Sequence, residues 1–339
     1  MSRTSRIIFP ALAAALVVTA IGQPSAAQPG GAPPSAVSST TIGVTSQLAD
    51  GTPVASEAEA ASVEAYWTPE RMANAIPVEA PPSDGQPPPG PDEPAGQPGE
   101  APPAAPEQPP VRDGSVAVDR AATAGKVFFR KPTNGRDYVC SASAINSPSK
   151  QMVITAGHCV NTGGNGSTAG KWMTNWTYVP AYHKGSRPYG TFSAKQFRTF
   201  KGWIDDSNWD WDVAMVTLLP RAGKKIVNVT GGHGLAWNHG RSEARTIFGY
   251  PGNHDKGEVQ WYCKGTTRRV AWNDGKVEIQ CNFGGGSSGG PWLHGYNNST
   301  QLGHVNGVTS TITKTGGWNA SSYFGDSVKA MFDAQGSKT

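Results

Sequence analysis

The chain has 339 residues and a net charge of +4, which leaves room for one large domain or two ordinary ones. The charge is unevenly distributed. Residues 28–115 contain twelve acidic and two basic side chains, whereas residues 116–339 contain 13 acidic and 25 basic ones. After the N-terminal leader no stretch is apolar enough to span a bilayer, which argues against an integral membrane protein.

Residues 1–27 have the pattern of a secretory signal peptide. Two arginines precede an apolar run at 7–22, and the small residues Ser25 and Ala27 follow at the spacing of a cleavage site. A retained membrane anchor is the alternative, but the run is short and interrupted by Pro10. We therefore expect cleavage after Ala27 and a secreted, extracellular protein with no membrane partner.

The acidic segment 28–115 divides into a helical part and a proline-rich part. A capping box begins at Ser56, and a second helix start with proline at its first position lies at Thr68. These signals predict two short amphipathic helices, whose apolar side chains are Val63, Tyr66, Trp67, Met72 and Ile76. Nineteen of the 28 prolines lie in this segment, most of them in 81–110, which predicts an extended, disordered linker.

From residue 116 onward the pattern changes to short β-rich runs separated by glycine-containing turns. Strand patterns of four to ten residues occur at 125–129, 151–156, 213–219, 244–250, 258–263, 276–281 and 304–313. Helical periodicity is nearly absent until 321–335. Many short strands followed by one terminal helix are typical of an all-β barrel or sandwich.

Four cysteines, all in the β-rich region, predict two disulfides in a secreted chain. Three pairings are possible, and closure of local loops favours Cys140–Cys159 and Cys263–Cys281. The acidic and amide residues in 206–212 alternate like the start of a calcium-binding loop, but its glycine and closing glutamate are missing. Since neither a CxxC pair nor an HExxH motif occurs either, we expect no metal and no cofactor.

Three fragments supply the residue types that acyl transfer requires. His158 follows a strand in TAGHC, Asp212 heads an apolar strand in DVAMV, and Ser288 lies in GSSGGP. A serine hydroxyl becomes a good nucleophile when an imidazole accepts its proton, and a carboxylate holds that imidazole in the right tautomer. Nearby glycines let backbone amides face a developing oxyanion. Taken singly, each fragment also fits a structural histidine, an exposed loop aspartate or a flexible Gly-Ser spacer.

Together and in this order, the three fragments resemble the signature blocks of the chymotrypsin-like (trypsin-type) serine proteases, and flanking strands extend the resemblance over about 116–335. The resemblance implies a double six-stranded β-barrel with a C-terminal helix and an active site between the barrels. It makes His158 the general base and acid, Asp212 its orienting carboxylate and Ser288 the nucleophile. The amides of Gly286 and Ser288 would form the oxyanion hole.

The sequence departs from the most familiar members of that family in its activation and specificity positions. Ser287 replaces the aspartate that pairs with a freed N-terminus, so the usual zymogen switch is missing. Asn282 replaces the specificity aspartate of trypsin, and Thr309 stands where glutamate-specific relatives carry histidine. The backbone of Ser310 would pair with an extended substrate. The chain looks closer to the bacterial glutamyl-endopeptidase-like branch, which also lacks the activation aspartate.

Within the aspartate fragment, Asp210 is a rival for Asp212, but the family's alanine two places later fits Asp212 alone. These observations predict a monomeric serine endopeptidase domain at 116–339 that acts on proteins or peptides and binds no nucleic acid. A non-catalytic secreted binding protein on the same scaffold and an esterase with the same triad are the alternatives.

The acidic segment 28–115 is expected to be a propeptide that docks on the basic domain and inhibits it or assists its folding. Opposite charges and the apolar helix faces favour docking, and the linker is long enough to let the helices reach back. Removal would require cleavage near Arg112 or Arg120. An acidic spacer that only solubilises the precursor is the alternative.

Overall fold

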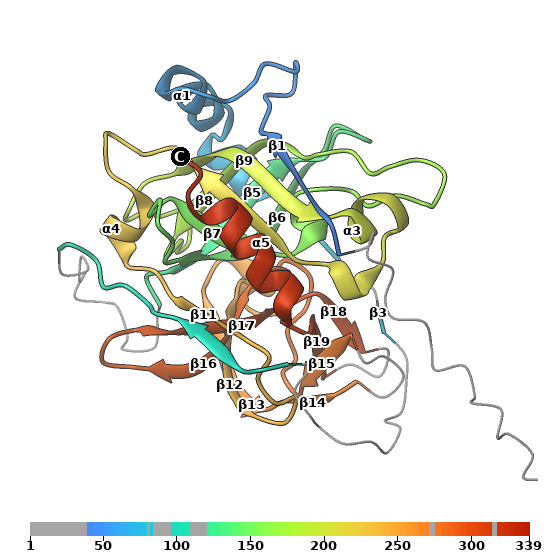
Figure 1. Ribbon diagram of the computed structural model, residues 1–339. Helices are drawn as coiled ribbons and strands as arrows, with labels where there is room; N and C mark the ends of the chain where they lie inside the picture. The colour runs from blue at the N-terminus through green and yellow to red at the C-terminus, as the bar shows by residue number, and fades with distance from the viewer. Residues whose placement is uncertain (1–38, 80–81, 84–95, 109–120, 271–274, 314–316) are drawn as a thin grey trace, which may run out of the picture. The chain divides into compact units, whose positions relative to one another are not determined.

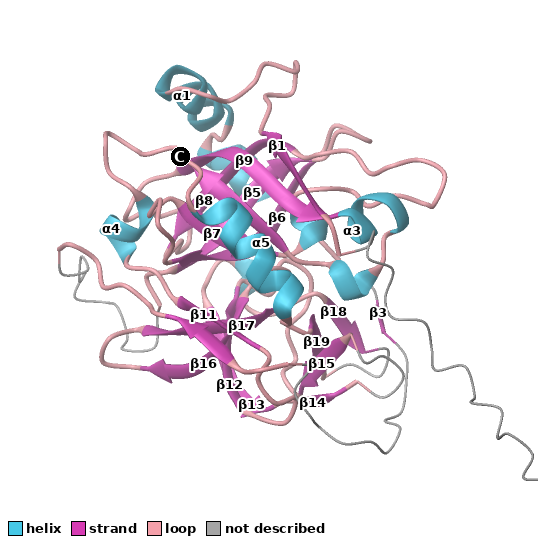
Figure 2. Ribbon diagram, viewed as in Figure 1, coloured by secondary structure: helices cyan, strands magenta, loops and turns pink. Residues whose placement is uncertain are grey.

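The computed structural model describes residues 39–79, 82–83, 96–108, 121–270, 275–313 and 317–339, all of which fall within one compact unit. The expected signal peptide and both candidate cleavage arginines lie outside the described residues. Strands dominate the described part of the chain (Figures 1 and 2). None of its helices has the length and apolarity needed to cross a membrane.

Six strands close into a β-barrel in the first half of the molecule. In spatial order they are β9 (Phe192–Phe200), β10 (Ala214–Leu218), β7 (Met152–Thr155), β6 (Asp137–Ile145), β5 (Ala124–Arg130) and β8 (Thr174–Pro180). Pairing of β8 with β9 completes the circle. Buried apolar side chains such as Phe129, Phe197 and Val216 fill the interior, which is where β-branched and aromatic residues are favoured.

The second half distributes its strands between two sheets. One sheet has the order β13 (Trp261–Thr266), β12 (Ala244–Gly249), β16 (Pro291–Asn297), β17 (Leu302–Val308) and β11 (Gly234–Trp237). The other has the order β14 (Arg268–Arg269), β15 (Lys276–Ile279), β19 (Asn319–Ser322) and β18 (Thr311–Thr313). Their shared core includes Ile247, Ile279 and Trp292. The β-rich prediction for residues 116–339 is thus confirmed.

Helices in this region are short apart from the last. They are α3 (Lys201–Asp206), α4 (Ile226–Thr230) and α5 (Asp326–Gly336), with 3-10 turns η1 (Gly157–Cys159), η2 (Trp209–Trp211) and η3 (Asp255–Gly257). Helix α5 packs against β9, β10 and β11 and buries Val328, Met331 and Phe332 (Figure 1). It confirms the predicted terminal helix, which begins later than expected because β19 extends to Ser322.

The described part of the acidic segment (residues 39–79, 82–83 and 96–108) is called the N-terminal segment here. Its elements are β1 (Thr41–Thr45), α1 (Glu57–Tyr66), α2 (Pro69–Asn74), β2 (Ile76–Pro77), β3 (Pro82–Ser83) and β4 (Gly99–Ala101). Strand β1 runs antiparallel to β9, β2 parallel to β6, β3 parallel to β18, and β4 antiparallel to β11. The N-terminal segment therefore extends sheets in both halves of the molecule.

Both predicted helices are present, with the expected caps. Ser56 forms the capping box with Glu59, whose Oε2 accepts from the Ser56 amide at 2.8 Å. Trp67 follows α1 and is only 1% exposed, packed against Phe128 with ring centroids 5.5 Å apart. Its Nε1 donates to the carbonyl of Asn175 at 2.6 Å. The apolar helix faces are thus buried on the first barrel.

The prediction of a disordered linker is wrong for residues 96–108. Strand β4 pairs with β11, and beyond it Ala104 exchanges two backbone hydrogen bonds with Gly232, at 2.9 and 2.8 Å. The amide of Glu107 then donates to the carbonyl of Asn228 at 2.9 Å. A proline-rich chain can follow a sheet edge in this way because prolines lose only the donors that face away from the sheet. Residues 84–95 of the predicted linker lie outside the described residues.

Candidate active site

His158 and Asp212 are brought together by the pairing of the strands that carry them. Strand β7 ends just before η1, and it pairs with β10, which begins two residues after Asp212. Asp212 Oδ1 accepts from the backbone amide of His158 at 2.8 Å, and Asp212 Oδ2 lies 2.8 Å from His158 Nδ1. Asp212 is fully buried. It is therefore Asp212, and not the rival Asp210, whose two oxygens hold the histidine.

Two further side chains complete the surroundings of this carboxylate. The hydroxyl of Ser310 donates to Asp212 Oδ2 at 2.7 Å, and the ammonium of Lys276 donates to Ser310 Oγ at 3.2 Å and to Thr311 Oγ1 at 3.3 Å. Sequence reasoning assigned only a backbone role to Ser310 and missed Lys276. Lys276 opens a strand pattern, where a lysine normally has its charge in solvent, so the sequence carried no signal for its burial.

The charges in this cluster support one another. Burial opposes ionisation of Asp212, but the His158 ring, the Ser310 hydroxyl and the Lys276 ammonium outweigh it and lower the pKa of Asp212. Burial lowers the pKa of Lys276 to about 8, although the carboxylates of Asp212 and Asp210 act in the opposite direction. Asp212 therefore remains ionised at neutral pH, as a carboxylate that orients an imidazole must be.

The glycine-serine loop is held rigidly by the first barrel. Ser141 donates its amide to the Ser288 carbonyl at 2.7 Å and its hydroxyl to the Gly286 carbonyl at 2.9 Å. Gly286 has φ +86°, and a Cβ at this position would lie 2.9 Å from the carbonyl oxygen of Tyr250. Only glycine suits that combination of left-handed backbone and close approach. The loop is a shaped backbone rather than a flexible spacer.

Ser288 and His158 each present a polar atom without a partner. Within the described part of the chain, Ser288 Oγ and His158 Nε2 are buried and form no hydrogen bond. Buried polar atoms are nearly always paired, so such exceptions are concentrated where a reaction or a ligand uses them. These are also the two atoms between which the predicted chemistry moves a proton.

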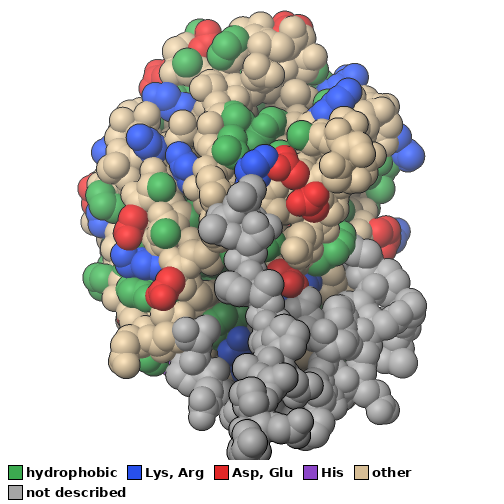
Figure 3. Space-filling model, turned by 45° about the vertical axis from the view of Figure 1, so that its right-hand side comes forward, with side chains coloured by type: hydrophobic (Ala, Val, Ile, Leu, Met, Phe, Trp, Pro, Cys, Tyr) green, Lys and Arg blue, Asp and Glu red, His purple; other side chains and the backbone are tan. Residues whose placement is uncertain are grey.

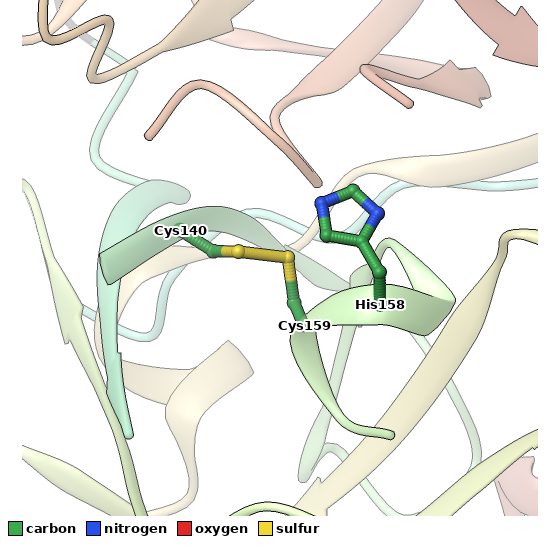
Figure 4. Close-up of side chains that lie close together, drawn as sticks. All are labelled: Cys140, His158 and Cys159. Atoms are coloured by element: carbon green, nitrogen blue, oxygen red, sulfur yellow. A yellow bond between two sulfur atoms is a disulfide. The ribbon is translucent and has the colours of Figure 1, made fainter. Parts of the chain in front are cut away.

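Both predicted disulfides are confirmed. Cys140 on β6 is bonded to Cys159 in η1, beside the ring of His158 (Figure 4). Because these two sulfurs are bonded to each other, they are not free thiolates next to the histidine. Cys263 on β13 is bonded to Cys281, seven residues before Ser288. One disulfide thus anchors the histidine turn and the other the entrance to the serine loop.

The N-terminal segment lies directly against the serine loop. The Gly286 amide donates to the carbonyl oxygen of Val78 at 2.9 Å, while the Val78 amide donates to the Val139 carbonyl on β6 at 3.1 Å. A Cβ at Gly286 would lie 3.3 Å from Pro77 Cβ, and one at Gly285 would lie 2.8 Å from the Val78 carbonyl oxygen. One of the two predicted oxyanion-hole amides is therefore already hydrogen-bonded within the chain.

The predicted specificity positions lie in different surroundings. Asn282 is exposed, and its carbonyl accepts from Asn253 Nδ2 at 3.0 Å and faces His254 Nε2 at 2.9 Å. Thr309 is fully buried, and its hydroxyl accepts from Trp292 Nε1 at 3.0 Å. Ser310 belongs to the Asp212 cluster described above.

Two other features noted in the sequence are the residue before Ser288 and the alternating polar run at 206–212. Ser287 donates its hydroxyl to the Gly284 carbonyl at 2.7 Å, so the residue in place of the activation aspartate braces the loop internally. Among the described residues, the alternating run 206–212 does not converge into a group of metal ligands.

A closed β-barrel joined to a second β-sheet half, with a hydrogen-bonded histidine–aspartate pair and a buried serine loop, is typical of the chymotrypsin-like class of serine proteases. The chain belongs to the chymotrypsin-like serine protease family.

Comparison with solved structures supports this assignment. The protease Anisep from Arthrobacter nicotinovorans is 32% identical, with a TM-score of 0.59, covering 65% of this chain and 97% of that one. The thermostable serine protease AL20 from an extremophilic microorganism is 29% identical, with a TM-score of 0.60, covering 66% of this chain and 100% of that one. A Glu endopeptidase structure, 17% identical with a TM-score of 0.51, shares the fold.

Curated relatives are bacterial proteases. The glutamyl endopeptidase of Bacillus licheniformis is 29% identical over 177 residues, which cover 51% of this chain, and the extracellular metalloprotease of Bacillus subtilis is 25% identical over 191 residues, which cover 55% of it. The chain spans about half the length of these two proteins, 51% and 56% respectively. No family model matches the chain.

Proposed function

We propose that the protein is a secreted serine endopeptidase in which Ser288 attacks the peptide carbonyl, with His158 as general base and acid and Asp212 as orienting group. The observation that carries this proposal is the double hydrogen bond of Asp212 to the amide and Nδ1 of His158. With Nδ1–H donated to the carboxylate, the lone pair of His158 is on Nε2, the atom that is buried without a partner.

The proposed reaction has two half-steps. Ser288 Oγ adds to the carbonyl carbon as its proton passes to His158 Nε2, and the amides of Gly286 and Ser288 stabilise the oxyanion. The imidazolium then protonates the leaving amine, and an acyl-enzyme remains. Water then attacks the acyl-enzyme in the same way, giving its proton to His158, and the carboxylic acid product leaves as Ser288 Oγ takes the proton back. Asp212 stabilises the imidazolium in both halves, and Ser310 and Lys276 hold Asp212 in place.

The same proposal makes the N-terminal segment an inhibitory propeptide. The Val78 carbonyl uses the Gly286 amide that a substrate oxyanion needs, and Ser288 is fully buried. A substrate carbonyl and the Val78 carbonyl cannot both occupy this donor. Cleavage between the N-terminal segment and the first barrel, followed by release, would expose the site. Two disulfides and the extracellular relative from Bacillus subtilis support secretion.

Asn282, Thr309 and the Ser310 backbone are proposed to contact the substrate. A peptide library cleaved by the processed enzyme identifies the preferred residue, and Thr309→Val and Asn282→Ala then show which position sets it. A change in preference without loss of kcat is the expected signature of a specificity residue.

A fluorophosphonate probe tests the proposed function. We expect it to label the processed protein, to label the uncut precursor far more slowly, and not to label processed Ser288→Ala. Failure to label the processed protein would leave the non-catalytic binding protein standing. Among the described residues visible in Figure 3, basic and acidic side chains are interspersed.

A further inference from the structure

A cluster of histidine and glutamate side chains joins the N-terminal segment to the second half of the molecule. Glu100 lies on β4, His239 follows β11, and His294 lies on β16. Strand β4 pairs with β11, and both belong to the sheet that contains β16. Glu100 Oε1 lies 3.5 Å from His239 Nε2 and 3.7 Å from His294 Nε2. One atom of each residue thus lies within 4.8 Å of the other two.

These separations suit a metal ion. Two ligand atoms held about 2.0–2.1 Å from a tetrahedral zinc ion lie roughly 3.4 Å apart. The two separations between Glu100 Oε1 and the ring nitrogens, 3.5 and 3.7 Å, are close to this value. Within the described part of the chain, His239 Nε2 is also a buried atom that forms no hydrogen bond.

The far sides of both rings face a second carboxylate. Glu243 Oε2 lies 3.2 Å from His294 Nδ1 and 3.7 Å from His239 Nδ1. Metal-binding histidines usually donate their other ring N–H to a carboxylate, which fixes the tautomer and leaves the ligating nitrogen its lone pair. The two rings here have this arrangement, with their Nε2 atoms directed at Glu100 and their Nδ1 atoms at Glu243.

Arg245 also contacts this cluster, with its Nη1 3.0 Å from His294 Nδ1 and 2.8 Å from Glu243 Oε2. Arginine only donates, so whenever Nη1 donates to His294 Nδ1 the ring proton is on Nε2, where it blocks a metal ion. Nη1 has two protons, which can instead go to Glu243 Oε2 and to the Ala244 carbonyl at 3.0 Å. His294 then takes the other tautomer, in which Nδ1 donates to Glu243 and Nε2 is free to bind the ion. Arg245 also balances the charge of Glu243, so the charge of Glu100 is the one that faces the cation. His304 Nε2 lies 3.7 Å from the other Glu100 oxygen, Oε2.

We propose that Glu100, His239 and His294 bind a divalent transition-metal ion, zinc before others, and that the ion fastens the N-terminal segment to the second half. Imidazole and carboxylate together suit zinc, and a fourth position remains for water. The half-exposed Glu100 and His294 leave a path for the ion to enter. The proposal concerns metal binding alone, so its failure would leave the proposed peptidase activity untouched.

The test uses the full-length chain carrying Ser288→Ala, which prevents self-cleavage, after removal of metal with a chelator. Cobalt(II) serves as the probe because its visible absorption reports coordination by nitrogen and oxygen ligands. We expect one cobalt ion per chain, displaced by one zinc ion. We expect both Glu100→Gln and the double variant His239→Ala/His294→Ala to lose the absorption.

Matched controls distinguish metal binding at this site from metal binding by other histidine or carboxylate side chains. Glu107→Gln alters a carboxylate in the same stretch of the N-terminal segment, and His254→Gln alters a histidine elsewhere, so both should bind cobalt like the parent. Circular dichroism of each metal-free variant verifies folding, and zinc should raise the Tm of the parent and of both controls only. Equal cobalt absorption in parent and double variant, or none in the parent, would overturn the proposal.

Discussion

The backbone amide of Gly286 donates a 2.9 Å hydrogen bond to the carbonyl oxygen of Val78. The donor belongs to the serine loop and the acceptor to the N-terminal segment, more than 200 residues apart in sequence. The chain therefore supplies a carbonyl of its own to an amide that the proposed reaction reserves for the substrate.

Replacing Gly286 by alanine tests the importance of this amide. The residue has φ +86°, and its Cβ would lie 2.9 Å from the Tyr250 carbonyl, so the loop must shift. We expect kcat/KM of the processed enzyme to fall by about 10²–10³-fold, the usual effect of losing one oxyanion donor. Gly295→Ala is the control, since Gly295 has φ +59° with no atom near its Cβ position. If kcat/KM fell equally in both variants, the loss would be due to backbone strain and not to the amide of Gly286.

The two neighbouring aspartates provide a second matched pair. Asp212→Asn keeps the shape of the side chain but removes the charge that fixes the His158 tautomer, so we expect kcat to fall by about 10³–10⁴-fold with little change in KM. Asp210→Asn should leave both constants close to those of the parent. Steady-state kinetics on a peptide substrate distinguish the two, and a large loss in Asp210→Asn would contradict the assignment.

Trp67 should be the main anchor of the N-terminal segment on the first barrel. Its side chain is buried and donates a 2.6 Å hydrogen bond to the Asn175 carbonyl. Trp67→Ala should weaken docking by about 3–5 kcal/mol. A cleavage site engineered between residues 109 and 120 allows both proteins to be cut at the same place. After cutting, we expect peptidase activity to appear much faster in Trp67→Ala than in the protein that keeps Trp67. Ile42→Ala, at a 39% exposed position on β1, should change this rate little.

Lys276 predicts a pH dependence of stability on the alkaline side. Its folded pKa of about 8 lies below its ordinary value of 10.5, so the folded chain binds fewer protons in this interval. The contribution of Lys276 to the unfolding free energy should therefore rise from pH 8 to 10.5, by at most about 1.4 kcal/mol per pH unit. Urea titrations of the parent and of Lys276→Met at a series of pH values measure this contribution. If the free energies of unfolding of the two proteins changed in parallel with pH, the prediction would be wrong.

His233 predicts a pH dependence of stability on the acid side. Burial lowers its pKa from 6.5 to about 3, while Thr123 Oγ1 lies 2.6 Å from Nε2 and Nδ1 accepts from the Gly303 amide. As the pH falls below 6.5, His233 becomes protonated in the unfolded chain while it stays neutral in the folded chain. The free energy of unfolding therefore decreases from pH 6.5 toward pH 3. The cost at pH 5 is about 2 kcal/mol. His233→Gln should flatten this part of the pH profile, and His254→Gln should not.

Sequence patterns identified the elements whose signals are local. The helix caps at Ser56 and Thr68, the strands around His158 and Asp212, and both disulfides follow from neighbouring residues or short loops. Strand β1 was missed, and β4 was assigned to a disordered linker, because each is short and depends on an edge offered by a distant strand. A proline-rich sequence cannot reveal that such an edge is available.

The same distinction applies to the candidate site. His158, Asp212 and Ser288 lie in recognisable motifs, so the sequence predicted them together. The hydroxyl of Ser310 meets Asp212 across 98 positions of the chain, and Lys276 joins them from another strand. No local pattern marks a lysine whose ammonium will be enclosed by a tertiary network, and this contact could be found only from the three-dimensional arrangement.

The four strand pairings of the N-terminal segment have a consequence for the timing of the proposed activation by cleavage. Strands β1 and β2 lie on the first barrel, and β3 and β4 on sheets of the second half. A single cut beyond β4 removes none of these pairings, so the cut chain begins as a complex of two tightly associated pieces. The delay between cutting and activity is then the lifetime of that complex. It is a first-order process, and its half-time stays constant when the precursor is diluted.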